Sequence, residues 1–323
     1  MADARKRLPT LRQLRHFVAV ADCGHFGHAT EACLVTQSSL SASIKELETG
    51  LGQVLIERTR RSVMLTPLGR EVLARARKIL RDTEDLVDLV AASRGPLHGP
   101  LRLGVIPTIG PFLLPRVLPA LRRAYPDLRL YLREERTAPL IERLNGGDLD
   151  LLLMAFPYPA EGLESHVFAD DGFWVAFAKG HGLAAKERVT YADLAGQELL
   201  LLEEGHCLRT HALSACRRLG QADAAGFQGT SLHTLVQMVD NGLGLTLLPK
   251  MAVDAGITKG ARVQVRPLEG RAAARRIGLA WRPSSPRKEE FLRLGEFFRD
   301  ELATPLPPAR GNRVRKKEPC GRG

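Results

Sequence analysis

The 323-residue chain lacks an uncharged apolar run of the roughly 18 to 20 residues that a membrane-spanning helix requires. It also lacks a cationic leader followed by an apolar core at its start. Its five cysteines are few and odd in number, which argues against a structural disulfide framework and predicts reduced thiols in a reducing compartment. We therefore expect a soluble cytoplasmic protein with no membrane partner, in which any disulfide would be regulated.

The overall composition is that of a globular chain. Hydrophobic residues make up 44% and charged residues 26%, which excludes a disordered chain and a collagen-like fibre. The length predicts two or three folding units with their own cores. The net charge of +11 is uneven, since residues 1–94 carry 15 basic and 11 acidic side chains and residues 304–323 carry six and one. A basic end can mark a nucleic-acid surface, although it can also serve solubility alone.

The usual sequence motifs for catalysis, metals and organic cofactors are missing. Cys207 and His211 could share a metal, but no second Cys/His pair at ligand spacing accompanies them. His206 next to Cys207 does not form a nucleophile–base pair, because adjacent residues on a helix do not face one another. Gly242-Leu-Gly244 lacks the remaining spacing of a dinucleotide loop, and we find no phosphate-binding loop. We expect no enzyme activity, no metal and no cofactor.

Three closely spaced helical patterns within residues 10–48 predict a helix-turn-helix. The first helix has an apolar side that includes Phe17, the second covers residues 25–32, and Thr36 is a good N-cap for the third. The buried stripe of the third helix consists of Leu40, Ile44 and Leu47. Its opposite face could enter a major groove and presents the DNA-binding candidates Thr36, Gln37, Ser38, Ser41 and Lys45. A three-helix part of some other domain is the alternative on the pattern alone.

A wing is predicted directly after these helices. Two short apolar runs, residues 54–56 and 63–65, suggest two strands joined by a turn. The turn region carries three arginines, Arg58, Arg60 and Arg61, which we expect to bind DNA phosphates.

A long helix is predicted from Pro67 to Arg94. Its apolar positions step by four and three residues, which is a heptad seam, and the seam residues are Val72, Ala76, Ile79, Thr83, Leu86 and Val90. We expect this helix to mediate self-association, which would also suit a helix-turn-helix dimer reading two half-sites. The alternative is a helix that packs only on its own domain.

Gly95-Pro-Leu-His-Gly-Pro100 interrupts the helical pattern and marks a linker. Beyond it, helical windows alternate with short apolar runs at residues 101–106, 128–132, 149–155, 173–178, 199–202, 243–248 and 277–281. The alternation predicts an α/β domain with largely parallel sheets, which could divide into two lobes. Thr108 follows the first run, so we expect it to line a ligand site at the carboxyl ends of the strands. Residues 304–323 are expected to form a basic disordered tail.

The most reactive chemistry is expected at Cys207. It follows an apolar run and Gly205, so it should begin a helix whose dipole, together with His206 and Arg209, would lower the pKa of the thiol. A thiolate attacks a peroxide oxygen and becomes a sulfenic acid, which a second thiol converts to a disulfide. Cys216 is the candidate for that second thiol.

The spacing between Cys207 and Cys216 predicts a conformational switch. In one continuous helix, nine residues separate their Cα atoms by about 13.5 Å and place the side chains on opposite faces, whereas a disulfide tolerates no more than about 7 Å. Closure would therefore require refolding of the segment. Two buried cysteines that never meet are the alternative. Cys23 and Cys33 are expected to fill a core, and Cys320 to be an incidental exposed thiol.

The N-terminal third resembles the winged helix-turn-helix of LysR-type transcriptional regulators. The matching residues are Leu11, Phe17, Phe26, Ala29, Ala32, the run Thr36-Gln-Ser-Ser-Leu-Ser-Ala-Ser-Ile-Lys-Glu-Leu-Glu48, Leu51-Gly52, Glu57-Arg58-Thr59 and Leu65-Thr-Pro67. Within that family, further segments resemble the hydrogen-peroxide sensors, namely Gly104-Val-Ile-Pro-Thr-Ile-Gly-Pro-Phe-Leu-Leu-Pro115, Gly205-His-Cys-Leu-Arg209 with Cys216, and Thr230-Ser-Leu232.

The resemblance implies a domain plan of residues 1–66 for the winged helix-turn-helix, 67–94 for the dimerisation helix and 95–303 for a regulatory domain. That regulatory domain would be two-lobed and periplasmic-binding-protein-like. The resemblance further implies a homodimer or homotetramer, with promoter DNA, hydrogen peroxide and RNA polymerase as partners and glutaredoxin or thioredoxin for reduction. It makes Cys207 the peroxidatic and Cys216 the resolving cysteine, and it places Thr108, Thr137, His206, Arg209 and Thr210 around the peroxide pocket.

Two departures from the family pattern bear on function. Thr210 stands where related sensors usually have Asp, so this position supplies a hydroxyl but no charge. In the third helix, Ser38 replaces the usual Pro, and Ala42 and Ser43 replace longer side chains, so the preferred operator is expected to differ.

Our leading hypothesis is a peroxide-sensing regulator of antioxidant genes, switched by a reversible disulfide between Cys207 and Cys216. Two alternatives stay open. A LysR-type regulator that answers a small-molecule inducer would need no redox chemistry, and a thiol-dependent enzyme would turn over substrate without DNA.

Overall fold

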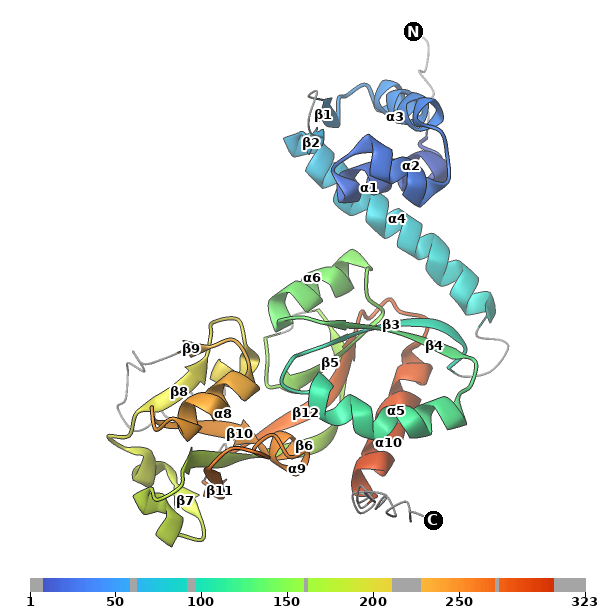
Figure 1. Cartoon of the computed structure of the whole chain (residues 1–323). Coiled ribbons are helices and arrows are strands. Elements are labelled where there is room, and N and C mark those ends of the chain that lie inside the picture. The colour runs from blue at the N-terminus through green and yellow to red at the C-terminus, as the bar shows by residue number, and fades with distance from the viewer. Residues whose placement is uncertain are drawn as a thin grey trace, which may run out of the picture.

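The computed structural model describes residues 8–58, 63–91, 97–159, 162–210, 228–270 and 273–304. A small N-terminal domain stands at one end of a long helix, and a larger domain of two lobes lies at the other end (Figure 1). In the part of the chain so described, no helix combines the length and the apolar character needed to cross a membrane.

The N-terminal domain is a winged helix-turn-helix, as the sequence predicted. Its elements are α1 (Leu11–Cys23), α2 (Phe26–Cys33), α3 (Gln37–Leu51), β1 (Ile56–Arg58) and β2 (Val63–Leu65). Strands β1 and β2 pair antiparallel. The predicted stripe of Leu40, Ile44 and Leu47 is buried together with Phe17 and Val20. The apolar faces of three short helices therefore share one core.

Helix ends and the wing are fixed by local hydrogen bonds. Thr36 is the N-cap of α3, where its hydroxyl accepts a hydrogen bond from the backbone N–H of Ser39. The Glu48 carboxylate on α3 accepts hydrogen bonds from the backbone N–H groups of Leu55 and Ile56 at 2.9 and 3.1 Å. The wing is thus held directly by the helix expected to bind DNA.

The long helix is α4 (Pro67–Ala91), close to its predicted bounds. Its start packs tightly on the wing, since a Cβ at Gly69 would lie 2.2 Å from the Leu55 carbonyl oxygen. Arg77 pairs with Asp22 of α1, and Arg81 donates to the Gly146 carbonyl of the larger domain. Helix α4 therefore contacts both domains.

The predicted seam of α4 divides into two parts. Ala76 is 1% exposed inside the N-terminal core and Val72 packs against that core, so the prediction that Ala76 faces a second chain is wrong. The physical reason is that the first turns of α4 complete their own domain. Ile79 and Leu86 are 46% and 61% exposed, and Thr83 is half-buried. The side chain of Val90 lies outside the described part.

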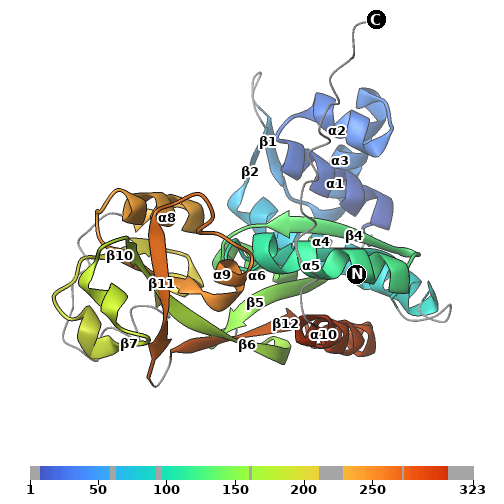
Figure 2. The ribbon, with the colours of Figure 1, turned by 60° about the horizontal axis from the view of Figure 1, so that its bottom comes forward.

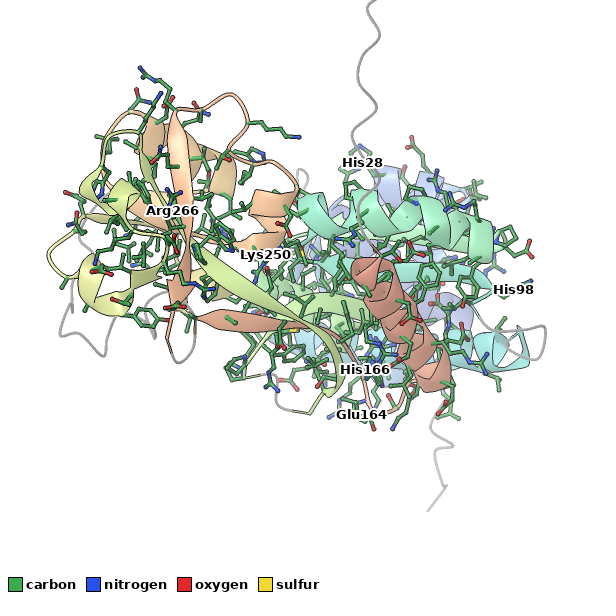
Figure 3. All side chains as sticks on the ribbon, turned by 90° about the horizontal axis from the view of Figure 1, so that it is seen from below. His28, His98, Glu164, His166, Lys250 and Arg266 are labelled. Carbon is green, nitrogen blue, oxygen red and sulfur yellow. The ribbon has the colours of Figure 1, made fainter. Side chains whose placement is uncertain are left out.

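The first lobe of the larger domain, lobe I, is built on the first three strands beyond the linker. Strands β4 (Leu128–Glu134) and β5 (Leu151–Phe156) flank β3 (Gly99–Val105), and both pair parallel with it. Three helices contribute to this lobe, namely α5 (Gly110–Ala124), α6 (Thr137–Gly146) and α10 (Lys288–Ala303). Figure 3 shows Glu164 and His166 beside α10, where His166 lies 3.0 Å from Glu296.

The second lobe, lobe II, has its own core of apolar side chains. It contains α8 (Leu232–Asp240), α9 (Lys250–Asp254), β7 (Val189–Thr190), β8 (Leu199–Leu202), β9 (Gln228–Gly229), β10 (Leu245–Pro249), β11 (Val263–Glu269), and the 3₁₀ turns η2 (Gly182–Ala185) and η3 (Tyr191–Leu194). The two separate cores support the predicted division into two lobes.

Two long strands connect the lobes. Strand β6 (Glu164–Ala178) pairs with β12 (Ala274–Trp281) near lobe I and with β10 and β11 in lobe II, and Figure 2 shows β6 and β12 running between the lobes. These pairings, and that of β12 with β5, are antiparallel. The predicted predominance of parallel strands therefore holds for β3, β4 and β5 of lobe I, whereas lobe II combines parallel pairs with the antiparallel pairs of β6.

Leu34, in the turn between α2 and α3, has a left-handed backbone with φ 54° and is 92% exposed. Its backbone is therefore strained without any gain in burial. Leu34→Gly should stabilise the N-terminal domain by roughly 0.5 to 1 kcal/mol in denaturant unfolding. Ala32→Gly, at an exposed helical position two residues earlier, should destabilise it by a similar amount. A loss of stability in both variants would contradict the strain at Leu34.

Candidate functional site

Cys207 lies between the two lobes and is 3% exposed. Strand β8 leads into a turn in which Gly205 has φ +90°, and helical backbone begins at Cys207. The Cys207 side chain belongs to the core of lobe I, whereas Leu208, the next residue, belongs to the core of lobe II. The segment carrying the thiol is thus anchored in both lobes at once.

Two buried threonines reach this region from the carboxyl ends of neighbouring strands. Thr108 follows β3 and is 2% exposed, and Thr137 is the first residue of α6, after β4, and is 1% exposed. The Thr137 hydroxyl interacts with the Cys207 thiol closely enough to lower the thiol pKa. It has no partner at ordinary hydrogen-bond geometry among the described residues. A buried hydroxyl in that situation is free to bind a small polar ligand.

A buried guanidinium connects the site to both lobes. Arg275 on β12 is 1% exposed and donates through Nε to the Asp171 carboxylate at 3.0 Å. It also donates to the Thr108 hydroxyl at 2.7 Å and to the Thr108 carbonyl at 2.8 Å. The other Asp171 oxygen accepts from the Met251 backbone N–H of α9 at 2.9 Å. The network therefore joins lobe I, lobe II and the connecting strands.

The prediction of a lowered Cys207 pKa is wrong for this structure. Burial raises the pKa of the Cys207 thiol, and this effect outweighs the lowering by Arg275, by the Thr137 hydroxyl and by the backbone N–H groups of Leu208 and Cys207. One predicted influence is present: the backbone N–H groups at the start of the helix lower the pKa of the thiol. Burial raises the thiol pKa by more than these groups lower it, and this burial depends on tertiary contacts that the local sequence does not show.

His206 and Arg209 do not supply the positive charge expected of them. Burial lowers the pKa of His206, the charge of Arg136 lowers it further, and Glu203 only partly opposes this, so the imidazole is neutral at neutral pH. Arg209 donates to the Leu202 carbonyl at 3.0 Å. The cation beside the thiol is Arg275 instead.

The predicted peroxide-pocket residues are only partly brought together. A cavity of about 130 Å³ between the lobes is lined by Thr108 and His206, with Phe112, Glu134, Thr230 and Ser231 among its other walls. Thr137 lies at the thiol, whereas Thr210 is exposed to solvent. Cys216 and His211 lie outside the described residues, so their positions stay predictions.

Arg275 and Asp171 were not singled out from the sequence. The apolar run that predicted the last strand began at residue 277, and a charged residue just before such a run resembles an exposed strand end. In the structure, β12 begins at Ala274 and Arg275 stands opposite Asp171 in the β6–β12 ladder. Opposite charges that face each other on paired strands could have pointed to Arg275 and Asp171, but this requires knowledge of the strand register.

The DNA-binding candidates on α3 lie on an accessible face. Thr36, Gln37, Ser38 and Lys45 are exposed, and Ser41 is half-buried. The α1 residue His16 is 4% exposed and lies 2.8 Å from the Ser43 hydroxyl through Nδ1, which attaches α3 to the domain core. Arg60, Arg61 and the side chain of Arg58 lie outside the described part of the wing.

Comparison with known proteins identifies the family. The model of the bacterial regulatory helix-turn-helix of the LysR family matches residues 11–70, and that of the LysR substrate-binding domain matches residues 94–303. The chain belongs to the LysR family of transcriptional regulators. Its predicted fold, a winged helix-turn-helix with a two-lobed α/β regulatory domain, is that of this family.

Several relatives within the LysR family carry peroxide-related names. The chain is 42% identical over 299 residues to a probable hydrogen peroxide-inducible genes activator of Streptomyces viridosporus, covering 92% of this chain and 96% of the relative. It is 38% identical over 292 residues to the transcriptional dual regulator OxyR of Escherichia coli, covering 90% and 95%. The structure of a full-length OxyR variant from Pseudomonas aeruginosa, in which Asp replaces a cysteine, matches with a TM-score of 0.74 and 35% identity, covering 91% and 94%. The predicted resemblance is thereby confirmed.

Removing the Arg275 guanidinium should leave Asp171 charged, buried and without its cation. Arg275→Met is therefore expected to reduce the free energy of unfolding by about 3 to 5 kcal/mol. Adding Asp171→Asn should recover part of this loss, because the amide oxygen can still accept from the Met251 N–H. Arg188→Met, which breaks an exposed pair with Glu269, should cost at most about 1 kcal/mol. Equal losses for Arg275→Met and Arg188→Met in urea unfolding would contradict the assigned network.

Proposed function

We propose that this protein is a hydrogen-peroxide-inducible transcriptional activator that binds promoter DNA through its N-terminal domain and senses peroxide at Cys207. The observation that carries the proposal is the placement of a buried thiol against the Thr137 hydroxyl and within the influence of the Arg275 charge. The names of two of the relatives reported above point to hydrogen peroxide as the signal. The protein acts as a regulator and not as an enzyme.

The proposed chemistry begins with ionisation of Cys207. Arg275, the Thr137 hydroxyl and two backbone N–H groups stabilise the thiolate once it forms, although burial keeps the neutral thiol favoured. The thiolate sulfur attacks one peroxide oxygen, a sulfur–oxygen bond forms, the oxygen–oxygen bond breaks, and the second oxygen leaves as hydroxide or water. Because the reactive form is the thiolate, the rate should increase as the pH rises towards and beyond the ordinary thiol pKa.

The sulfenic acid would next condense with Cys216 to form a disulfide and release water. Because one continuous helix would separate the two Cα atoms by about 13.5 Å, we propose that this step refolds the segment and draws the buried Cys207 side chain out of the core of lobe I. On this proposal, the disulfide replaces the present contacts of Cys207. Glutaredoxin or thioredoxin, by thiol–disulfide exchange, would restore the reduced form.

DNA recognition is proposed for the exposed face of α3 and for the wing. Gln37 and Ser38 stand in the first turn, where they can reach base edges, and Lys45 can reach a phosphate. The wing residues Arg58, Arg60 and Arg61 are proposed to bind phosphates. As an activator, the DNA-bound protein would recruit RNA polymerase.

The switch is tested by treating the full-length protein with one equivalent of hydrogen peroxide and mapping thiols and disulfides by mass spectrometry. The wild type should form a Cys207–Cys216 bond, Cys216→Ser should stop at a sulfenic acid, and Cys207→Ser should not react at this site. Cys33→Ser should behave as the wild type. Footprints on promoter DNA should change with peroxide in the wild type and in Cys33→Ser but not in Cys207→Ser.

Three results would contradict the proposal. An unreactive Cys207 would exclude a peroxide sensor, and an unchanged peroxide response in Cys207→Ser would favour a regulator that answers a small-molecule inducer. Absence of any salt-sensitive DNA binding in the wild type would exclude a DNA-binding regulator.

We also propose that α4 dimerises through the exposed half of its seam and that dimers assemble further into a tetramer. Ile79 and Leu86 are seven residues apart, and together with Val87 they leave an apolar strip uncovered. The N-terminal half of α4, which includes Val72 and Ala76, packs against the core of its own N-terminal domain.

The double variant Ile79→Lys and Leu86→Lys should shift the protein towards monomer, because it would place two lysines from each chain in the dimer interface. Sedimentation velocity over a concentration series gives the association state. Ala74→Lys adds a charge at an exposed α4 position away from the strip and should leave the association unchanged. Unchanged sedimentation of the double variant would rule out this interface.

A further inference from the structure

Three neighbouring parallel strands of lobe I each lead to a hydroxyl-bearing residue. The order across the sheet is β4-β3-β5, and the carboxyl ends of these strands lie at one edge. Thr137 follows β4, Thr108 follows β3, and Tyr158 follows β5 by two residues. The two threonines belong to the site around Cys207, and Tyr158 stands at the same edge of the sheet.

Tyr158 lies near the start of β12, where Arg275 stands, because Phe156, two residues before Tyr158, pairs with Arg276. Its ring is half-buried and packs against the apolar core of lobe I, which includes Cys207. Burial raises the pKa of Tyr158, and the negative charge of the Cys207 thiolate raises it further. The two groups are thus coupled electrostatically, and the phenol keeps its proton when the thiolate forms.

Proton donors for a departing oxygen are otherwise weak at this site. His206 is neutral because its pKa is lowered, and Thr210 is exposed. The Thr108 hydroxyl accepts from Arg275 and keeps its own proton to donate, but it is a weak acid. An aliphatic hydroxyl is nearly as weak an acid as water, whose pKa is about 15.7, whereas a phenol has a pKa of about 10. Even with its pKa raised by burial, the Tyr158 phenol is a stronger acid than the threonine hydroxyls.

We propose that Tyr158 is a third hydroxyl of the peroxide site and the proton donor to the leaving oxygen. This inference rests on the proposed function, because it assumes that Cys207 reacts with peroxide. The Cys207 sulfur gives two electrons to one peroxide oxygen, a sulfur–oxygen bond forms and the oxygen–oxygen bond breaks. The other oxygen takes the phenol proton and leaves as water. The phenolate then recovers a proton from solvent, so Tyr158 is unchanged over the reaction.

The test compares oxidants whose leaving groups differ in their need for a proton. In full-length protein, Tyr158→Phe keeps the ring and removes the hydroxyl, and its rate of Cys207 oxidation is followed by stopped flow with mass spectrometry of the product. With hydrogen peroxide, the variant should be slower by about 10²-fold, the lower end for general acid catalysis. With peracetic acid, which releases acetate, it should react at nearly the wild-type rate. Iodoacetamide alkylation of Cys207 should also stay unchanged, because it requires no proton donor.

The matched control is Tyr131→Phe, which removes a phenol hydroxyl from a side chain that is 56% exposed on β4 and should react like the wild type with all three reagents. Equal slowing of Tyr158→Phe with hydrogen peroxide, peracetic acid and iodoacetamide would mean that Tyr158 only supports the packing, and no slowing at all would remove it from the site. Either result overturns the inference while leaving peroxide sensing intact. A wild-type protein that fails to oxidise at Cys207 would instead overturn the proposed function itself.

Discussion

The central constraint in this structure is the burial of one cation, Arg275, at the point where the two lobes meet. A buried guanidinium requires partners for its N–H groups, and it finds them in Asp171 on β6 and in both oxygens of Thr108 beyond β3. Asp171 in turn holds the first residues of α9. The position of lobe II relative to lobe I is therefore linked to the same group that lowers the pKa of the Cys207 thiol.

Burial and charge act on Cys207 in opposite directions, and burial has the larger effect. A thiol that stays neutral in the reduced protein is protected from indiscriminate oxidation and metal binding, since the thiolate is the reactive form. The polar groups around it become important only when a proton has left. Burial thus limits both the ionisation of the sulfur and its access to solvent.

Much of the architecture could be predicted from local sequence patterns. The three helices of the N-terminal domain, the long helix from Pro67 and all seven apolar strands follow from periodicity and capping residues such as Thr36. What the sequence could not supply depends on contacts between distant segments. The register that pairs Arg275 with Asp171, the burial that raises the Cys207 pKa, and the use of Ala76 by its own domain arise only when residues far apart in the chain are packed together.

The Cys207 side chain packs in the core of lobe I, and the adjacent Leu208 side chain packs in the core of lobe II. This short segment therefore links the two lobes by packing. Any modification that draws the sulfur out of lobe I must give up that packing and the Thr137 interaction together. The lobe I side is also where α4 attaches, through Arg81 to Gly146 and through Glu84 to Arg102 at 3.5 Å. Helix α4 extends from lobe I to the wing that Glu48 of α3 holds in place, so it is the element through which the proposed switch at Cys207 would have to act on the N-terminal domain.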